Sequence, residues 1–201
     1  MTPEVLPLFP TAIYKHKIRS LLDTELLAVN NAPMISQGLG NHSSVNTYIL
    51  ELEELAELKN EILHNINVYF CDVLHFTNEV YITNSWINIT DSNEMHMGHT
   101  HTNSIISGVY YIDVDTSQPL ISFNRIAPPF LLNILPTEFN IFNSIEWDVP
   151  VENNSIVLFP SSCYHYVKRN ESANKRISIA FNTFIRGQLG TRFSGADLDL
   201  R

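Results

Sequence analysis

The sequence is poor in cysteine, in basic residues and in long apolar runs, and each shortage excludes a class of protein. Two cysteines, Cys71 and Cys163, cannot build a disulfide framework, so we expect free thiols in a reducing, cytoplasmic compartment. Twelve Lys and Arg against 21 Asp and Glu give a formal charge of −9, which argues against a nucleic-acid partner because such binding needs clustered basic side chains. No run approaches the roughly 20 apolar residues that cross a bilayer, and the N-terminus lacks the basic start of a signal peptide, so we expect no membrane contact.

The overall composition is that of an ordinary folded protein, with 44% apolar and 16% charged residues. A chain of 201 residues is long enough for one domain with a proper core and too short for two comfortable ones. We therefore predict a single domain over residues 1–201.

The N-terminal part predicts a strand followed by a short helix. Residues 6–18 mix apolar and polar positions, which indicates an initial strand, and an edge strand here offers a route to a homodimer. Ser20 with Asp23 resembles an N-cap box, which predicts a helix through about Val29.

A loop and a long helix follow. Residues 30–46 are rich in Asn, Ser and Gly and predict a loop. From about residue 50 to 74, apolar residues recur every three or four positions, which predicts the longest helix of the chain. The helical support thus covers roughly residues 20–76.

Nearly all the remaining chain predicts short strands, and Trp86 and Trp147 are expected in their core. Many short strands after a helical region favour a sandwich or barrel closed by antiparallel pairing. The tail from Gly187 is expected to be loosely held. The expected strands cover residues 80–89, 105–113, 120–123, 130–135, 139–142, 147–151, 156–159, 165–167 and 176–184.

Two histidines, His99 and His101, lie one residue apart just before an apolar strand. Side chains two apart on an extended chain project from the same face, so both imidazoles can approach one point. Imidazole is the commonest metal-ligating side chain, and the third candidate ligand is His165, in another short β-type segment. These three histidines predict a metal site, although one member of a close pair is often only a surface residue.

Arg176 and Ser178 alternate with apolar residues on the last expected strand and so share a face. An arginine that points into an apolar barrel is costly unless it meets an anion. No Asp or Glu lies on that strand, so the sequence predicts that the anion is a ligand. A guanidinium binds a carboxylate through two parallel hydrogen bonds, and a neighbouring hydroxyl adds another.

Together these motifs resemble the 2-oxoglutarate- and Fe(II)-dependent oxygenases, and more narrowly an uncharacterised, prolyl-hydroxylase-like subgroup of bacteria and phages. The resemblance extends from Leu8-Phe9-Pro10-Thr11 to about Phe184. It rests on the series His99-x-His101, Ser107-Gly-Val-Tyr-Tyr-Ile112, Leu158-Phe-Pro, His165 and Arg176-x-Ser178-x-x-Phe-Asn182.

The resemblance implies a mainly β fold, a double-stranded β-helix or cupin-like jelly roll over roughly residues 78–186, with iron at its open end. It assigns the metal to His99, His101 and His165. It places Arg176 and Ser178 at the far carboxylate of the cosubstrate 2-oxoglutarate, and it adds the contacts Tyr111 and Asn88.

The expected activity is oxidation of a substrate C–H bond, coupled to decarboxylation of 2-oxoglutarate to succinate and CO₂. The substrate class stays open between a small molecule and a protein side chain.

His101 occupies the position at which the broad family has a carboxylate. The narrower subgroup shares the His-x-His sequence. A neutral imidazole leaves the metal more cationic. This difference leaves three outcomes open: iron of altered reactivity, another metal, or binding without turnover. The alternative to an enzyme is therefore a non-catalytic, cupin-like metal-binding or structural module, which has no need of the carboxylate clamp at Arg176 and Ser178.

Overall fold

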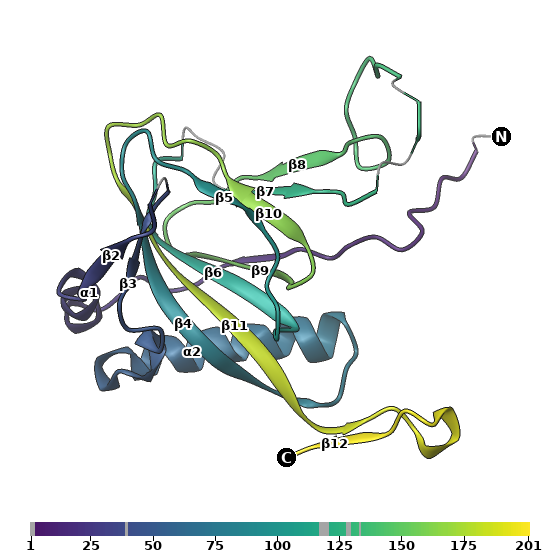
Figure 1. Cartoon of the computed structure of the whole chain (residues 1–201), viewed down its shortest axis with the longest axis horizontal. Helices are drawn as coiled ribbons and strands as arrows, with labels where there is room; N and C mark the ends of the chain where they lie inside the picture. The colour runs from purple at the N-terminus through teal and green to yellow at the C-terminus, as the bar shows by residue number, and fades with distance from the viewer. Residues whose placement is uncertain (1–2, 39, 117–120, 128–129, 133) are drawn as a thin grey trace.

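Two antiparallel sheets face each other, with the smaller lying above the larger in Figure 1. The computed structural model describes residues 3–38, 40–116, 121–127, 130–132 and 134–201. This architecture confirms the predicted mainly β jelly roll.

The large sheet has the strand order β1-β9-β6-β11-β4-β3-β2, and β12 pairs with β11. The bounds of these strands are β1 Tyr14–Lys17, β2 Met34–Ser36, β3 His42–Ser44, β4 Glu79–Thr90, β6 Ile106–Asp113, β9 Ser155–Pro160, β11 Arg176–Leu189 and β12 Leu198–Leu200.

The small sheet carries the histidines. Its strands run in the order β5-β10-β7-β8, which leaves β5 and β8 at the edges. Their bounds are β5 His96–His99, β7 Ile121–Asn124, β8 Glu146–Val149 and β10 Tyr164–Val167.

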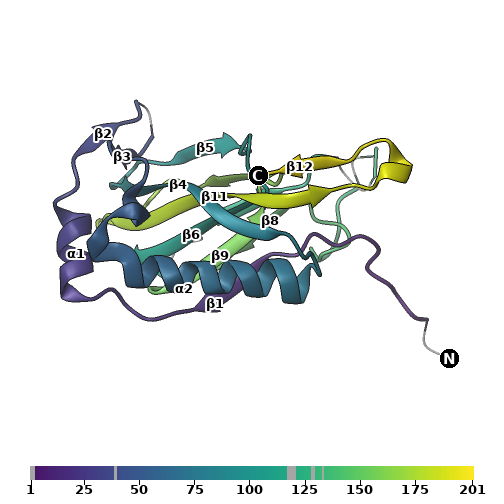
Figure 2. The same ribbon diagram turned by 90° about the horizontal axis from the view of Figure 1, so that it is seen from below.

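Helices cover the outer face of the large sheet, where α2 runs beneath the strands (Figure 2). The helices are α1 Asp23–Asn30 and α2 Ala56–Asn67, and α2 continues as a π-helical segment Val68–Val73. Leu58, Ile62 and Ile66 recur on one helical face and are fully buried in the main core. Full burial of such a side chain contributes about 1.5–3 kcal/mol, so this face holds the helix on the sheet.

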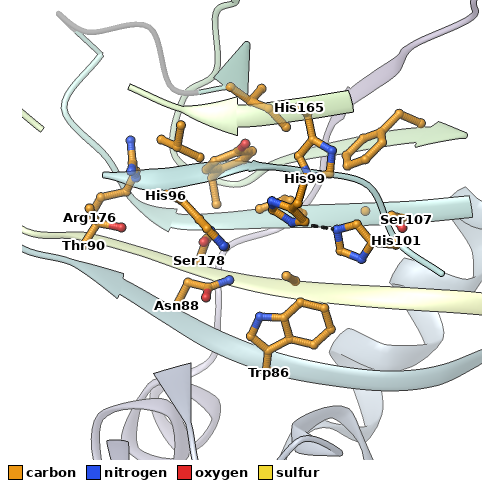
Figure 3. A pocket seen from close by; sticks show the side chains of 17 residues that line it. Trp86, Asn88, Thr90, His96, His99, His101, Ser107, His165, Arg176 and Ser178 are labelled. Carbon is orange, nitrogen blue, oxygen red and sulfur yellow. Dashed lines mark hydrogen bonds between the residues drawn. The ribbon is translucent and has the colours of Figure 1, made fainter. Parts of the chain in front are cut away.

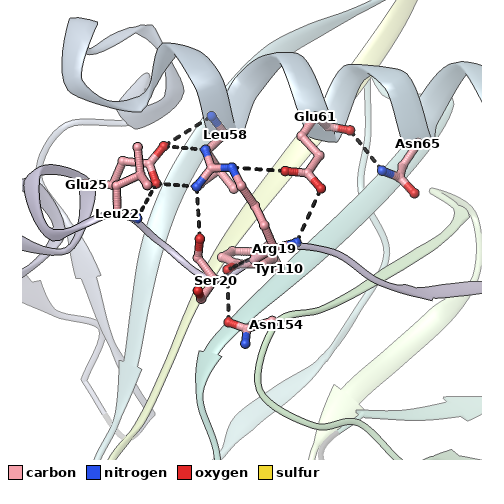
Figure 4. A network of polar contacts seen from close by, with 9 residues as sticks. All are labelled: Arg19, Ser20, Leu22, Glu25, Leu58, Glu61, Asn65, Tyr110 and Asn154. Atoms are coloured by element: carbon pink, nitrogen blue, oxygen red, sulfur yellow. Dashed lines mark hydrogen bonds and ion pairs between the residues drawn. The ribbon is translucent and has the colours of Figure 1, made fainter.

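A buried ion pair joins the N-terminal segment to both helices (Figure 4). The Glu25 carboxylate is fully buried, and two Arg19 nitrogens donate to its oxygens, each over 2.6 Å. Backbone N–H groups of Leu22 and Leu58 donate to the same carboxylate, and Arg19 also pairs with Glu61. Burial opposes ionisation of Glu25, but these donors outweigh it and hold the pKa of the carboxyl below its usual range. The network fixes α1 and α2 relative to the sheet.

Several sequence-based expectations about the N-terminal part need correction. The initial strand is shorter than residues 6–18, because only β1 pairs with a neighbour. Leu22, and not Ser20, precedes α1, and its N–H is satisfied by Glu25. The expected loop at 30–46 contains the hairpin β2–β3, because β3 finds a partner in β4.

Other corrections concern the C-terminal part. Among the described residues of 130–135 and 139–142 no strand forms, and residue 133 lies outside the described residues, as does Leu120 of an expected strand. Trp147 is 46% exposed because it lies on the edge strand β8. The tail is held in part, because β12 pairs with the end of β11.

Candidate metal centre and cosubstrate cavity

His99, His101 and His165 converge between the two sheets (Figure 3). His99 on β5 lies directly opposite His165 on β10 in the small sheet, with ring centroids 4.4 Å apart. The chain leaves β5 after His99, and the His101 N–H donates to the Ser161 carbonyl over 3.0 Å. One ring nitrogen from each histidine lies within 4.8 Å of those of the other two. The structure thus brings the three predicted ligands together.

Backbone carbonyls orient two of the imidazoles for metal binding. His99 Nδ1 lies 2.8 Å from the Met97 carbonyl oxygen, and His165 Nδ1 lies 3.0 Å from that of Cys163. A carbonyl only accepts, so each Nδ1 carries the proton and each Nε2 keeps a lone pair. His99 Nε2 lies 3.1 Å from His101 Nε2, a separation suited to two ligands of one ion. The donor set therefore fits a transition metal.

Burial keeps His101 and His165 neutral. It lowers the pKa of His101 to about 4 and that of His165 to about 3. His96, stacked on His99 with ring centroids 4.7 Å apart, has a pKa lowered to about 4, again mainly by burial. Neutral imidazole is the form that binds metals, so at pH 7 His101 and His165 need lose no proton first.

A glycine permits the close pairing of His99 and His165. A side chain at Gly98 would collide with the ring of Tyr164 on the neighbouring strand β10. The absence of a Cβ lets β5 lie close against β10, so that His99 faces His165. This glycine, which separates Met97 from His99, is a signal in the sequence that the prediction of the metal site did not use.

On the large sheet, β11 presents Arg176 and Ser178 to the same cavity as the histidines. Arg176 is only 6% exposed, and its Nη2 is buried without a hydrogen-bond partner. Burial lowers the pKa of Arg176, but a guanidinium stays charged at neutral pH. None of the described residues that line the cavity is Asp or Glu. The cavity thus holds a buried cation whose donors are not all used by the protein.

Tyr111 and Asn88 lie on either side of Ser178 in one row across the sheet. Ser178 on β11 is registered with Tyr111 on β6 and with Asn88 on β4. Tyr111 is 2% exposed, and burial raises the pKa of its phenol, so it is a neutral donor. Asn88 Oδ1 accepts a hydrogen bond from Asn41 Nδ2 over 2.6 Å, which fixes the amide at the cavity wall. All four predicted cosubstrate contacts line one cavity.

A chain of buried polar groups lies behind His101. The Asn182 side chain hydrogen bonds to the His101 ring. Ser107 Oγ donates to Asn182 Oδ1 over 2.8 Å and contacts Ser161 Oγ over 2.8 Å, and Ser161 donates to Ser104. Asn182 had no role predicted from the sequence, although the alternation that aligns Arg176 with Ser178 continues to it. Partners of this kind fix ring orientation.

Trp86 packs on the other side of His101. The two rings are stacked, with centroids 6.0 Å apart and an interplanar angle of 22°. Trp86 also lines the cavity, so it belongs to the site as well as to the packing between the sheets. The prediction that Trp86 is a core residue therefore describes only part of its role.

An open groove of about 700 Å³ leads to the histidines from the β2–β3 side. Amides and hydroxyls form much of its wall, including Asn41, Asn84, Ser43 and Thr102. Among the described residues that line it there is no Asp, Glu, Lys or Arg. The groove offers hydrogen bonds without fixed charge.

Comparisons with known proteins agree with this architecture. Residues 84–182 match the family model described as "Putative 2OG-Fe(II) oxygenase". No curated protein matches the chain in sequence. HygX from Streptomyces hygroscopicus, solved with nickel, 2-oxoglutarate and hygromycin B, has a TM-score of 0.60 at 10% identity, over 86% of this chain and 82% of that one.

Two further solved structures share the fold. The non-heme alpha ketoglutarate dependent carbocyclase SnoK has a TM-score of 0.57 at 14% identity, over 89% of this chain and 81% of that one. A Pseudomonas putida prolyl-4-hydroxylase has a TM-score of 0.54 at 12% identity, over 88% of this chain and 94% of that one. At these identities the likeness concerns the fold.

Proposed function

Residues 84–182 belong to the 2OG-Fe(II) oxygenase family, and from this premise we propose that His99, His101 and His165 hold Fe(II) while Arg176 binds the far carboxylate of 2-oxoglutarate. The family uses Fe(II) and 2-oxoglutarate. The observation that carries the proposal is Arg176 Nη2, a buried donor without a partner in a cavity whose described lining has no carboxylate. A dicarboxylate cosubstrate supplies the missing acceptor.

Each residue of the cavity has a definite task in this proposal. When bound, iron and 2-oxoglutarate supply the oxidation of a substrate C–H bond, coupled to release of succinate and CO₂. Arg176 pairs with the far carboxylate, and the Ser178 hydroxyl adds a hydrogen bond beside it. Tyr111 donates its phenol proton to the same ligand, and Asn88, held by Asn41, borders it.

His101 distinguishes this centre from one with a carboxylate ligand. A neutral imidazole adds no negative charge, so the metal keeps one more unit of positive charge than it has beside Asp or Glu. The Asn182 hydrogen bond and the Trp86 stack then fix the His101 ring without electrostatic attraction to the metal. The same substitution favours the second candidate, a cupin-like module that binds metal without turnover.

The substrate enters along the groove beside His99 and His101 in this proposal. HygX was solved with hygromycin B, and another neighbour is a prolyl-4-hydroxylase, which agrees with a small molecule or a protein side chain as substrate. The absence of Lys and Arg from the described groove residues disfavours a nucleic-acid substrate.

Two further expectations stay predictions. A homodimer through β1 would use its free edge, since β1 pairs only with β9 among the described strands. A cytoplasmic location rests on the cysteine content alone. No helix within the described residues is long and apolar enough to cross a membrane.

An anaerobic optical titration tests the proposal. Metal-free protein receives Fe(II) and then 2-oxoglutarate, and we expect a visible charge-transfer band that needs both additions. Arg176→Ala should lower the affinity for 2-oxoglutarate at least about 30-fold, because removal of a buried charged partner costs roughly 2–5 kcal/mol. Arg186→Ala is the matched control, since Arg186 lies on the same strand but pairs with Glu79 at the surface.

Each alternative gives a different titration. Iron binding without the band would reject 2-oxoglutarate as cosubstrate and favour the cupin-like module. An unchanged affinity for 2-oxoglutarate in Arg176→Ala would reject the assigned clamp. Succinate formation in the presence of substrate candidates, measured with the wild-type protein, separates turnover from binding alone.

A further inference from the structure

A second group of metal-ligating side chains lies outside the histidine centre. It consists of His42 on β3 with Asp91 and Glu94 in the connection between β4 and β5, and we call it the rim cluster. One ligand atom from each residue lies within 4.8 Å of the other two. Its neighbours in sequence, Asn41 and His96, line the groove, so the cluster stands where the hairpin meets the β4–β5 connection.

The distances in the rim cluster are too long for hydrogen bonds. His42 Nε2 lies 3.5 Å from Glu94 Oε1 and 3.8 Å from Asp91 Oδ2. An N–H···O hydrogen bond spans about 2.7–3.2 Å. Two ligands that each lie about 2.1 Å from a tetrahedral zinc ion are roughly 3.4 Å apart. The spacing thus resembles that of atoms around an ion.

The charges of the rim cluster also favour the binding of a cation. Asp91 and Glu94 both direct an oxygen at His42, and among the described residues neither forms an ion pair with Lys or Arg. The second Glu94 oxygen accepts the Asp91 N–H over 2.9 Å, which holds the two carboxylates together. Two carboxylates so placed repel each other unless a positive charge lies between them.

We propose that the rim cluster binds a divalent cation of the zinc type through His42 Nε2, Asp91 Oδ2 and Glu94 Oε1. One imidazole and two carboxylates are a donor set that zinc accepts, and a water molecule completes four ligands. The side chains of Glu94 and His42 are 25% and 35% exposed, so the ion can enter from solvent. This site is separate from the proposed iron centre and does not depend on it.

A bound ion would join two walls of the groove. His42 belongs to the β2–β3 hairpin, whereas Asp91 and Glu94 lie just before β5, which carries His99. The Asn41 amide beside His42 already donates to Asn88 on β4, the strand that leads into this connection. The ion would therefore hold the hairpin against the β4–β5 connection and order the entrance to the histidines.

Zinc stoichiometry, measured by equilibrium dialysis of the full chain followed by elemental analysis, tests the site. The wild type should hold two zinc ions per chain, because the three histidines also accept zinc, and His42→Ala should hold one. Glu94→Gln, which keeps the acceptor for the Asp91 N–H, should weaken the second ion about tenfold. His16→Ala, which changes an exposed histidine on β1 outside both clusters, should still hold two.

A second readout keeps the test decisive. In His99→Ala/His101→Ala, which disables the histidine centre, zinc should slow amide hydrogen exchange in the hairpin strands Met34–Ser36 and His42–Ser44, and adding His42→Ala should remove that effect. One zinc ion in the wild type would overturn the proposal, as would two in His42→Ala. Unchanged exchange with zinc bound would overturn the role in joining the groove walls.

Discussion

The histidine centre and the rim cluster lie at the same groove but differ in their donor atoms and in their burial. The centre uses three nitrogen donors between two sheets, whereas the rim combines one nitrogen with two carboxylates at the surface. Burial keeps His101 and His165 neutral, because charged imidazoles would lose hydration there. The rim instead concentrates negative charge, which water tolerates. Depth therefore decides which donor types a fold can gather at one point.

The contrast extends to what orients the ligands. Carbonyls of Met97 and Cys163 hold His99 and His165, and an amide holds His101, so the centre is formed in the folded chain before any ion binds. The rim has one such support, the Asp91 N–H on Glu94. We expect high affinity at the centre and weaker, exchangeable binding at the rim.

The largest effect should follow loss of a central ligand. His165→Ala should abolish Fe(II) binding at the centre, because two imidazoles cannot hold the ion where three are needed, while one zinc ion should remain at the rim. Equilibrium dialysis with each metal measures both sites in one protein. Full Fe(II) retention in His165→Ala would show that His165 is not a ligand, and loss of both metals would show that the two sites are coupled.

Asn182→Ala should weaken Fe(II) at the centre by about 10- to 100-fold, the usual effect of losing a group that orients a metal-bound histidine. Binding at the rim should not change. Asn182→Asp keeps an acceptor for Ser107 in the same place and should restore most of the affinity. Competition with a chelator gives the affinity, and the optical spectrum of the Co(II)-loaded protein reports ligand geometry. Equal loss in Asn182→Ala and Asn182→Asp would contradict an orienting role.

Acidification of the metal-free protein should lower its free energy of unfolding through the buried histidines and not through exposed ones. The pKa of His101 is about 4 and that of His165 about 3, against an ordinary 6.5. Below pH 6.5 the unfolded chain therefore binds more protons than the folded chain, so the free energy of unfolding falls as pH drops. Each of these histidines contributes on the order of 1 kcal/mol per pH unit.

Urea denaturation at pH 7.5, 6.5 and 5.5 measures this slope. His96, whose pKa is also lowered to about 4, adds to the slope. His165→Gln removes one of these three groups and should flatten the slope, whereas His16→Gln on the exposed strand β1 should leave it unchanged. A slope that is the same in the wild type and His165→Gln would contradict the burial argument. Bound metal should abolish most of the slope, since it excludes the proton.

The sequence was sufficient to predict the strands that are buried and alternating. β4, β6, β9 and β11 lie where β-forming residues cluster, because β-branched and aromatic side chains pack well on a pleated, buried surface. The hairpin β2–β3 was missed, since its Ser- and Asn-containing residues become strands only by pairing with β4. Trp147 was misplaced because an aromatic residue on an edge strand has the same local pattern as one in the core.

The residues of the candidate site also fall into those that the sequence predicted and those that it did not. His99-x-His101 and Arg176-x-Ser178 were visible because their members share one face of one local segment. Asn182 was on the same alternation, but nothing local indicates that it reaches His101. The rim cluster was not visible at all, since His42 and Asp91 are far apart in the chain and neither lies in a motif.

The sequence by itself determined the succession of short strands, the pair of histidines before an apolar strand, and the arginine on the last long strand, because these follow from residue type and from a period of two. Tertiary structure alone decided that His165 lies opposite His99, that Arg176 keeps an unused donor, and that His42 meets two carboxylates. The physical reason is that hydrogen-bond register and burial are properties of paired strands, and pairing joins segments whose separation along the chain carries no local signal.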